Sequence, residues 1–167
     1  MSVHAQFRKP LSRNEVLERW MGLPPDVRPE GFRAEMNEYG ELLLAPQPAN
    51  WHQLLAYRIS RQLEDQLGGS GITAIAVQTR IGVRVPDACW TEDSGFFESA
   101  VAPRAPEICV EVASSSNTER ELLEKADAYL DAGAREVIVV ELDRRVRYFD
   151  ANGERETSSF AINLVLN

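Results

Sequence analysis

Residues 107–142, EICVEVASSSNTERELLEKADAYLDAGAREVIVVEL, decide the fold of this 167-residue chain. The stretch begins with the apolar run EICVEVA and ends with the nearly continuous apolar run EVIVVEL, which is typical of a buried strand. Between them, Thr118 and Glu121 have the spacing of a capping box, and Gly133 provides a helix stop. A strand, a crossover helix and a second buried strand predict a mixed sheet covered by helices, which indicates an α/β domain.

The rest of the chain adds helices and strands on both sides of this unit. Apolar periodicity and turn residues predict each of them. We expect a helix over 12–21, a β-hairpin with strands 32–36 and 41–45, a helix over 50–67, strands over 72–79 and 82–90, and edge strands over 145–150 and 161–167. The length suits one domain with one sizeable core.

The strand predicted over 82–90, GVRVPDACW, is interrupted by Pro86 and Asp87. Proline cannot donate a hydrogen bond to a sheet, and aspartate is depleted in strands. A local rule that is broken without local benefit indicates a functional position. The interruption therefore marks Asp87 as a candidate site residue.

Two carboxylates are expected to converge on the sheet. Because strand side chains alternate between faces, Asp87 shares a face with Cys89, and Glu111 shares a face with Cys109. If the two strands pair antiparallel with Asp87 near Glu111, the like charges repel unless a cation or a proton neutralises them. A few hard oxygen ligands with room for water suit Mg²⁺.

Lys125 is the third candidate residue. The chain has 16 arginines and only two lysines, Lys9 and Lys125. Lys125 lies at the rim of the apolar face of its predicted helix, so its stem can follow the core while its ammonium reaches the end of the sheet. A carboxylate pair with a lysine is the working set of metal-dependent phosphodiester hydrolysis. Drift on a solvated helix is the alternative interpretation of this lysine.

Three stretches carry a resemblance to a known family: PDACW, EICVEVASSSNT and EKADAYLDAGAREVIVVEL. They resemble the PD-(D/E)XK nuclease superfamily and, more closely, the Uma-two family of restriction endonuclease-like proteins. The resemblance implies a restriction endonuclease-like mixed β-sheet flanked by helices, with an N-terminal helix and β-hairpin extension. It implies one domain over 1–167, with residues 1–30 as the extension and residues 31–150 as the core that resembles the family.

The resemblance also implies roles for individual residues. Asp87 and Glu111 would be the first and second ligands of Mg²⁺ or Mn²⁺, and the carbonyl of Val112 a third. The wider superfamily carries its lysine two residues after the glutamate, where this chain has Ala113. The resemblance therefore assigns that role to Lys125, as a lysine that has moved from the strand to the helix.

Three further residues match family positions. His52 lies at the start of the helix predicted over 50–67, and the resemblance gives it an auxiliary catalytic role. An N-terminal helix residue near solvent is the equal alternative for His52. Glu35 matches a family glutamate, but a hairpin glutamate that faces solvent is the favoured interpretation. Tyr129 matches the aromatic residue one turn after the lysine.

The two cysteines are expected to be buried free thiols. Cys89 and Cys109 lack the CxxC spacing of a zinc site, and directly opposed strand positions stand wider apart than a disulfide requires. Two cysteines together with an N-terminal sequence that lacks the apolar core of a signal peptide predict a cytoplasmic protein. No window holds ~18 uninterrupted apolar residues, so we expect no membrane span.

The net charge of −8 argues against broad affinity for nucleic acid, which requires a basic surface. It is compatible with an acidic, cation-binding site beside a local arginine patch. We therefore expect a Mg²⁺-dependent endonuclease that acts on DNA, for which a symmetric homodimer would be the simplest arrangement. Two alternatives stay open. One is an inactive nuclease-fold domain that serves as a binding or assembly module, and the other is a metal hydrolase of smaller phosphoesters.

Overall fold

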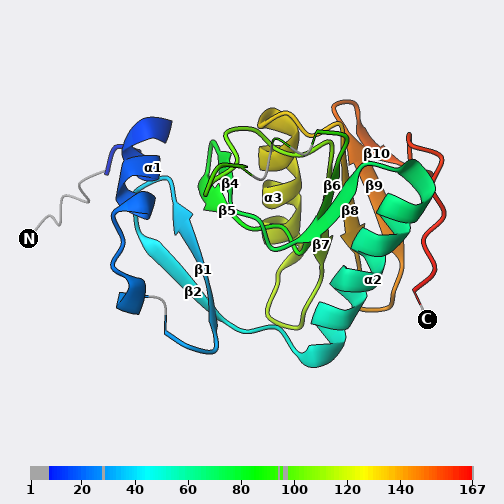
Figure 1. The fold of residues 1–167 in the computed structure, drawn as a ribbon, viewed down its shortest axis with the longest axis horizontal. Helices are drawn as coiled ribbons and strands as arrows, with labels where there is room; N and C mark the ends of the chain where they lie inside the picture. The colour runs from blue at the N-terminus through cyan, green and yellow to red at the C-terminus, as the bar shows by residue number, and fades with distance from the viewer. Residues whose placement is uncertain (1–7, 28, 94, 96–97, 167) are drawn as a thin grey trace, which may run out of the picture.

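The computed structural model describes residues 8–27, 29–93, 95 and 98–166, which form three α-helices, one 3₁₀ helix and ten strands (Figure 1). In chain order these are α1 (Arg13–Met21), η1 (Pro25–Val27), β1 (Phe32–Asn37), β2 (Leu42–Pro46), α2 (Asn50–Leu67), β3 (Ser70–Thr73), β4 (Val77–Thr79), β5 (Gly82–Arg84), β6 (Ala88–Thr91), β7 (Ile108–Val112), α3 (Glu119–Asp131), β8 (Glu136–Val140), β9 (Val146–Asp150) and β10 (Gly153–Arg155).

The strands form two sheets rather than one. The larger sheet has six strands in the order β10-β9-β8-β7-β6-β3, and the smaller has four in the order β2-β1-β5-β4. Among the strands that the structure describes, β7 and β8 pair in parallel through the crossover helix α3, and the other strand pairs are antiparallel. An isolated parallel bridge also joins Val77 to Ala102. The α/β class and the mixed sheet flanked by helices are therefore confirmed, and the smaller antiparallel sheet is added to them.

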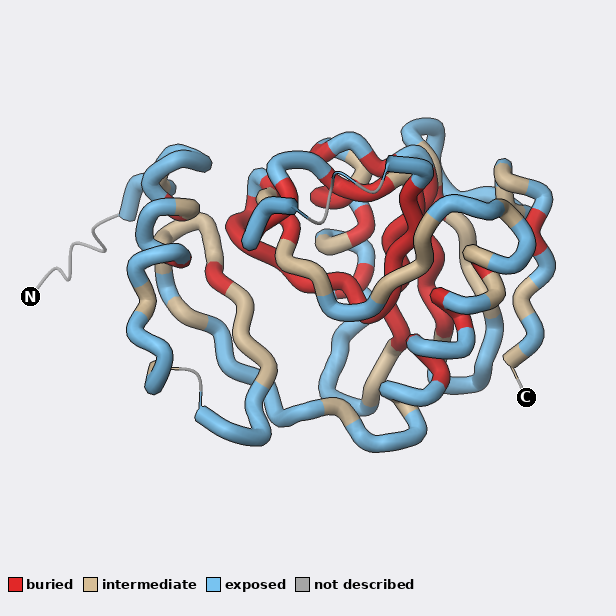
Figure 2. The backbone as a smooth tube through the Cα atoms, in the orientation of Figure 1, coloured by how far each residue is buried: buried red, intermediate tan, exposed pale blue. Residues whose placement is uncertain are grey.

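Helices α2 and α3 cover opposite faces of the six-stranded sheet (Figure 1). Alternation along β7 explains the division: Cys109 packs with the α3 side of the core, and Val110 packs with the α2 side. Glu111 follows Val110 and so points toward α3. Buried residues are concentrated in β6, β7 and β8 between the helices, whereas the β1–β2 hairpin is largely half-buried or exposed (Figure 2).

The strands predicted over 72–79 and 82–90 are each divided between the two sheets. The first divides into β3 and β4, and the second into β5 and β6. Both single-strand predictions were therefore wrong. Pro86 has no N–H to donate, whereas the N–H of Asp87 donates to the carbonyl of Val110 in β7 at 2.9 Å. The interruption in GVRVPDACW is thus the point where the chain leaves the small sheet and enters the large one.

Both predicted capping boxes are present. At α1, the Ser12 side chain accepts from the N–H of Glu15, whose carboxylate accepts from the N–H of Ser12. At α3, Thr118 and Glu121 make the same reciprocal pair. Each capping box satisfies two N–H groups that a helix start leaves without partners. The start of each helix was therefore predictable from the four consecutive residues of its capping box.

The edge strand predicted over 161–167 was wrong for the part of it that the structure describes. Residues 161–166 have no strand, and Asn167 lies outside the described residues. The segment lies along α2, where Gln62 and Gln66 hydrogen-bond the backbone of Val165 and Asn163. Its alternate apolar residues pack on the helix, and β10 pairs with β9 as the sheet edge instead.

The N-terminal part of the chain packs against the small sheet. Val16 and Trp20 of α1 share a buried cluster with Met36 of β1 and Val83 of β5. In the described part of the chain, no helix has the length and apolar character needed to cross a membrane. The helix, the hairpin and β5 thus form one wall of the molecule, and the six-stranded sheet faces them.

Candidate functional site

Asp87 lies opposite Glu111 at the point where the chain changes sheets. The antiparallel register pairs Ala88 with Val110, and one more step along it brings Asp87 across from Glu111. The two residues are 6% and 3% exposed, respectively. The prediction that these strands pair antiparallel and bring the two carboxylates together is therefore confirmed.

Glu111 is surrounded by α3. The hydroxyl of Tyr129 donates to its Oε1 at 2.8 Å, and Lys125 Nζ lies 3.4 Å from each carboxylate oxygen. Burial raises the pKa of Glu111 to about 7, although the charge of Lys125 opposes the rise, and the nearby Asp87 adds to it. A buried carboxylate with this pKa is one that binds either a proton or a cation near neutral pH.

Lys125 has a second and closer partner that the sequence interpretation missed. Its Nζ donates to Oε1 of Glu35 at 2.9 Å, and the N–H of Val85 donates to the same oxygen at 2.9 Å. Burial alone would lower the pKa of Lys125, but the charges of Glu111 and Glu35 raise it. The lysine is therefore a fixed cation between two carboxylates.

The interpretation of Glu35 as a solvent-facing hairpin residue was wrong. Its side chain is 13% exposed and lies in the site. Burial raises the pKa of Glu35, but Lys125 and the Val85 N–H outweigh burial and lower the pKa overall. The alternation of β1 could have indicated this position, because Arg33 and Glu35 share one face while Ala34 and Met36 lie on the other.

Asp87 is held through both of its oxygens. Its Oδ1 accepts from Arg33, and its Oδ2 accepts from the N–H of Val112 at 2.7 Å. Burial raises the pKa of Asp87, but the hydrogen bond with His52 and the charge of Arg33 lower it overall. Arg33, which comes from β1 of the other sheet, was not predicted as a site residue.

His52 reaches the same point from the start of α2. Its Nε2 lies 2.8 Å from the carbonyl oxygen of Val112 and 3.4 Å from Oδ2 of Asp87. Because a carbonyl only accepts, this nitrogen carries a proton and donates. Burial would lower the pKa of His52, but its contacts with Asp87 raise it. The structure therefore favours the site over solvent for His52.

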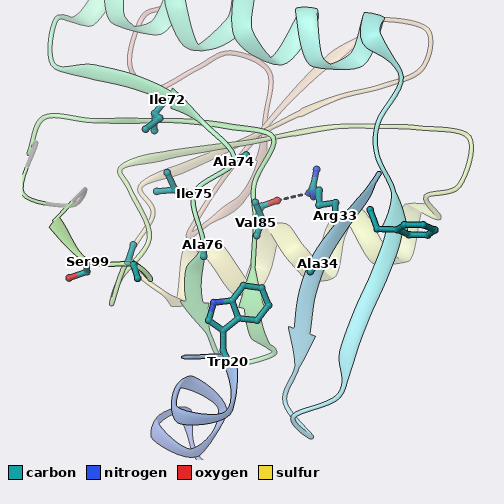
Figure 3. Close-up of a pocket in the computed structure, with 12 residues that line it drawn as sticks. Trp20, Arg33, Ala34, Ile72, Ala74, Ile75, Ala76, Val85 and Ser99 are labelled. Carbon is teal, nitrogen blue, oxygen red and sulfur yellow. Dashed lines mark hydrogen bonds between the residues drawn. The ribbon is translucent and has the colours of Figure 1, made fainter. Parts of the chain in front are cut away.

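These residues line one cleft of about 700 Å³ between the two sheets. Its walls include Arg33, Glu35, His52, Asp87, Glu111 and Lys125. A second, largely apolar cavity of about 450 Å³ shares Arg33 with the cleft (Figure 3). Four elements and the sheet-changing segment thus deliver their charged side chains to one place.

A family model matches most of the chain. Residues 17–162 match the Uma2 family, which carries the description "Putative restriction endonuclease". The chain belongs to the Uma2 family. The match to Uma2 extends beyond residues 31–150, because it begins within α1 and ends in the segment that follows β10.

A solved structure has the same fold as this Uma2 protein. It is the crystal structure of a protein described as a putative nuclease belonging to DUF820 from Anabaena variabilis, and the superposition gives a TM-score of 0.64 at 16% sequence identity. It covers 91% of this chain and 92% of the other. This likeness supports the restriction endonuclease-like fold. No curated protein matches the chain.

The donor set in this Uma2 chain suits Mg²⁺ in its chemistry. Asp87, Glu111 and the Val112 carbonyl offer only hard oxygen atoms, and Mg²⁺ is commonly held by one or two carboxylates while it keeps several waters. Within the described ranges, no three His, Cys, Asp or Glu side chains are arranged as a metal site. The set is therefore two carboxylates, which pair with Arg33 and Lys125, and one carbonyl, which accepts from His52.

The cysteines take no part in this donor set. Cys89 and Cys109 are free, buried and directly opposite each other in the β6–β7 pair. Burial raises the pKa of Cys89 to about 12 and that of Cys109 well above its ordinary value. The prediction of buried free thiols is confirmed.

Proposed function

We propose that this protein is a metal-dependent endonuclease that hydrolyses phosphodiester bonds in DNA. Its membership of the Uma2 family supports nuclease activity in general terms. The single observation that carries the proposal is the meeting of Asp87, Glu111 and Lys125 in one cleft, at the segment where the chain passes between the sheets. Metal-dependent phosphodiester hydrolysis uses these side-chain types.

The proposed roles follow from the contacts of each residue. Asp87, Glu111 and the carbonyl of Val112 would hold Mg²⁺ or Mn²⁺. Such an ion, when bound, polarises a phosphoryl oxygen and lowers the pKa of a coordinated water. Lys125 keeps its ammonium at the cleft wall, where its protons can orient the attacking water or offset charge on the phosphate. His52 acts on the site through its hydrogen bond to Val112.

The proposed substrate must approach a chain with a net charge of −8. Affinity therefore has to come from the local arginines of the cleft, Arg33 and Arg84, and from a bound cation rather than from a general basic surface. We also propose a symmetric homodimer, because two copies present two sites to the two strands of a duplex. The free, buried cysteines support the cytoplasm as the compartment of action.

A binding or assembly module of the same fold is the second candidate. One observation favours it: Arg33 and Lys125 already neutralise Asp87 and Glu111 without a metal ion. In such a module the cleft would be a structural ion-pair network. Cleavage assays separate the two candidates.

The test is Mn²⁺-dependent cleavage of supercoiled plasmid by the wild type, Asp87→Ala and Lys125→Ala. Arg120→Ala is the matched control, because Arg120 is an exposed cation on the same helix and does not line the cleft. We expect cleavage by the wild type and the control, and its loss in the other two variants. Absence of cleavage by all four folded proteins over a wide range of Mn²⁺ would favour the binding module.

A further inference from the structure

Six charged side chains form a continuous network across the two sheets. Ion pairs join Arg33 to Asp87 and Glu35, Arg84 to Glu35, and Lys125 to Glu35 and Glu111. Three are carboxylates and three are permanent cations, so the network is neutral when every carboxylate is ionised. A divalent cation added to this network meets three positive charges in a buried place, and like charges there repel strongly.

Arg33 is the cation that competes most directly with a metal ion for Asp87. The Oδ2 of Asp87 is occupied by the N–H of Val112 at 2.7 Å and has His52 within 3.4 Å. The remaining oxygen, Oδ1, is the one that Arg33 contacts. Lys125, in contrast, is already closer to Glu35 than to Glu111. A metal ion that binds Asp87 therefore competes with Arg33 before any other residue.

Arg33 has anchors that do not depend on Asp87. Its second terminal nitrogen donates to the carbonyl of Val85 at 2.5 Å (Figure 3). The same nitrogen lies 3.7 Å from Glu35. Arg33 also lines the second cavity, whose labelled residues are mostly apolar, among them Trp20 and Ile75 (Figure 3). A guanidinium buried there would lose its polar partners at a high cost in free energy. A short movement within the cleft is therefore the favoured one.

We propose that Arg33 is an exchangeable counter-ion, bound to Asp87 in the metal-free protein and to a phosphate of the substrate once a divalent cation occupies Asp87. The inference rests on the proposed function and assigns the phosphate-binding residue of its site. While Val85 and Glu35 hold one side of the guanidinium, the nitrogen released from Asp87 faces the cleft. Arginine is suited to this exchange because its planar fork fits both carboxylate and phosphate oxygens.

The first measurement is the affinity of the full-length protein for Mn²⁺ alone, by isothermal titration calorimetry. We expect Arg33→Gln to bind Mn²⁺ about tenfold more tightly than the wild type, because the substitution removes the buried positive charge that pairs with Asp87, the proposed ligand of the ion. Arg84→Gln is the matched control: it removes the same charge from the same network but leaves Asp87 paired. Its affinity should stay within about threefold of the wild type.

The second measurement is cleavage of duplex DNA at saturating Mn²⁺. Arg33→Gln should raise KM more than it lowers kcat, because the lost contact is with a substrate phosphate. Tighter metal binding combined with weaker substrate binding cannot arise from general damage to the fold. If Arg33→Gln does not fold by circular dichroism, Arg33→Lys carries the test. The lysine ammonium lacks the planar fork of arginine and holds Asp87 less firmly. Arg33→Lys should therefore bind Mn²⁺ at least about threefold more tightly than the wild type.

The outcomes separate this inference from the function on which it rests. Cleavage by the wild type with equal Mn²⁺ affinity in Arg33→Gln, or an equal gain in Arg84→Gln, overturns the exchange and leaves the nuclease. Mn²⁺ binding by Arg33→Gln with neither binding nor cleavage by the wild type supports Arg33 as the competing cation and overturns the nuclease. Absence of Mn²⁺ binding in every folded variant overturns both.

Discussion

Lys125 Nζ lies 2.9 Å from a carboxylate oxygen of Glu35 and 3.4 Å from both oxygens of Glu111. The lysine of α3 is therefore held more closely by the hairpin of the small sheet than by the strand of the large one. This contact fixes the ammonium at a definite place in the cleft. The hairpin is thus part of the candidate site as well as part of the fold.

Glu35→Gln should lower kcat for DNA cleavage roughly tenfold with little change in KM. Glutamine keeps a hydrogen-bonding oxygen for the Val85 N–H but loses the charge that holds Lys125, so the ammonium moves onto Glu111. Steady-state kinetics on a duplex substrate with saturating Mn²⁺ measures the effect. Glu38→Gln, in the turn of the same hairpin, is the control, and equal kcat in the two variants would contradict the role given to Glu35.

Stability of the metal-free protein should fall as pH rises from about 5.5 to 8. The pKa of Glu111 is raised from 4.5 to about 7, so the folded state binds more protons than the unfolded state in that window. His52, whose pKa is also raised, adds stability that is lost as pH rises through its folded pKa. Asp87 and Glu35 have lowered pKa values, and their stabilisation is lost only on the acid side.

Thermal unfolding in EDTA at the two pH values measures this fall, which we expect to be roughly 5 °C. Glu111→Gln should remove most of it, because the amide does not titrate. Glu18→Gln, which replaces an exposed carboxylate on α1, should leave the fall as it is in the wild type. A wild type that is equally stable at both pH values would refute the raised pKa of Glu111.

Tyr129→Phe should destabilise the protein by about 1–2 kcal/mol. The tyrosine is 0% exposed and its hydroxyl donates to Glu111 at 2.8 Å, so its removal leaves a buried carboxylate with one donor fewer. Urea unfolding at pH 8 gives the free energy of unfolding. Tyr148→Phe is the control, because Tyr148 is half-buried on β9, and a loss equal to that of Tyr129→Phe would show that the Glu111 contact contributes nothing.

Cys89 and Cys109 should be unreactive toward a disulfide reagent in the native protein and should both react in denaturant. Both side chains are 0% exposed, and the burial that raises their pKa values keeps the thiolate fraction very small at pH 8. Release of thionitrobenzoate from Ellman's reagent counts the thiols in each state. Rapid reaction of either thiol in the folded protein would mean that the β6–β7 pair opens readily.

The sequence alone determined the parts of this protein that depend on neighbouring residues. The helix starts were readable because Ser12 with Glu15, and Thr118 with Glu121, satisfy backbone groups only three residues away. The crossover over 107–142 was readable from its two apolar runs. Asp87 was found because a proline and a carboxylate stand where a strand needs neither.

Only the tertiary structure decided which sheet each short strand joins. The hydrogen bonds of a strand go to residues far along the chain. The sequences of residues 72–79 and 82–90 therefore do not indicate which strands they pair with. The same holds for the site. Arg33 contacts Asp87, Glu35 contacts Lys125, and His52 contacts Val112, and each pair joins residues of different elements. The alternation of β1 predicts which face each of its side chains lies on, but not which residues of other elements it contacts. The elements are predictable because they depend on hydrogen bonds between residues close in the sequence. The site depends on strand pairing and burial between residues far apart in the sequence, so only the tertiary structure shows it.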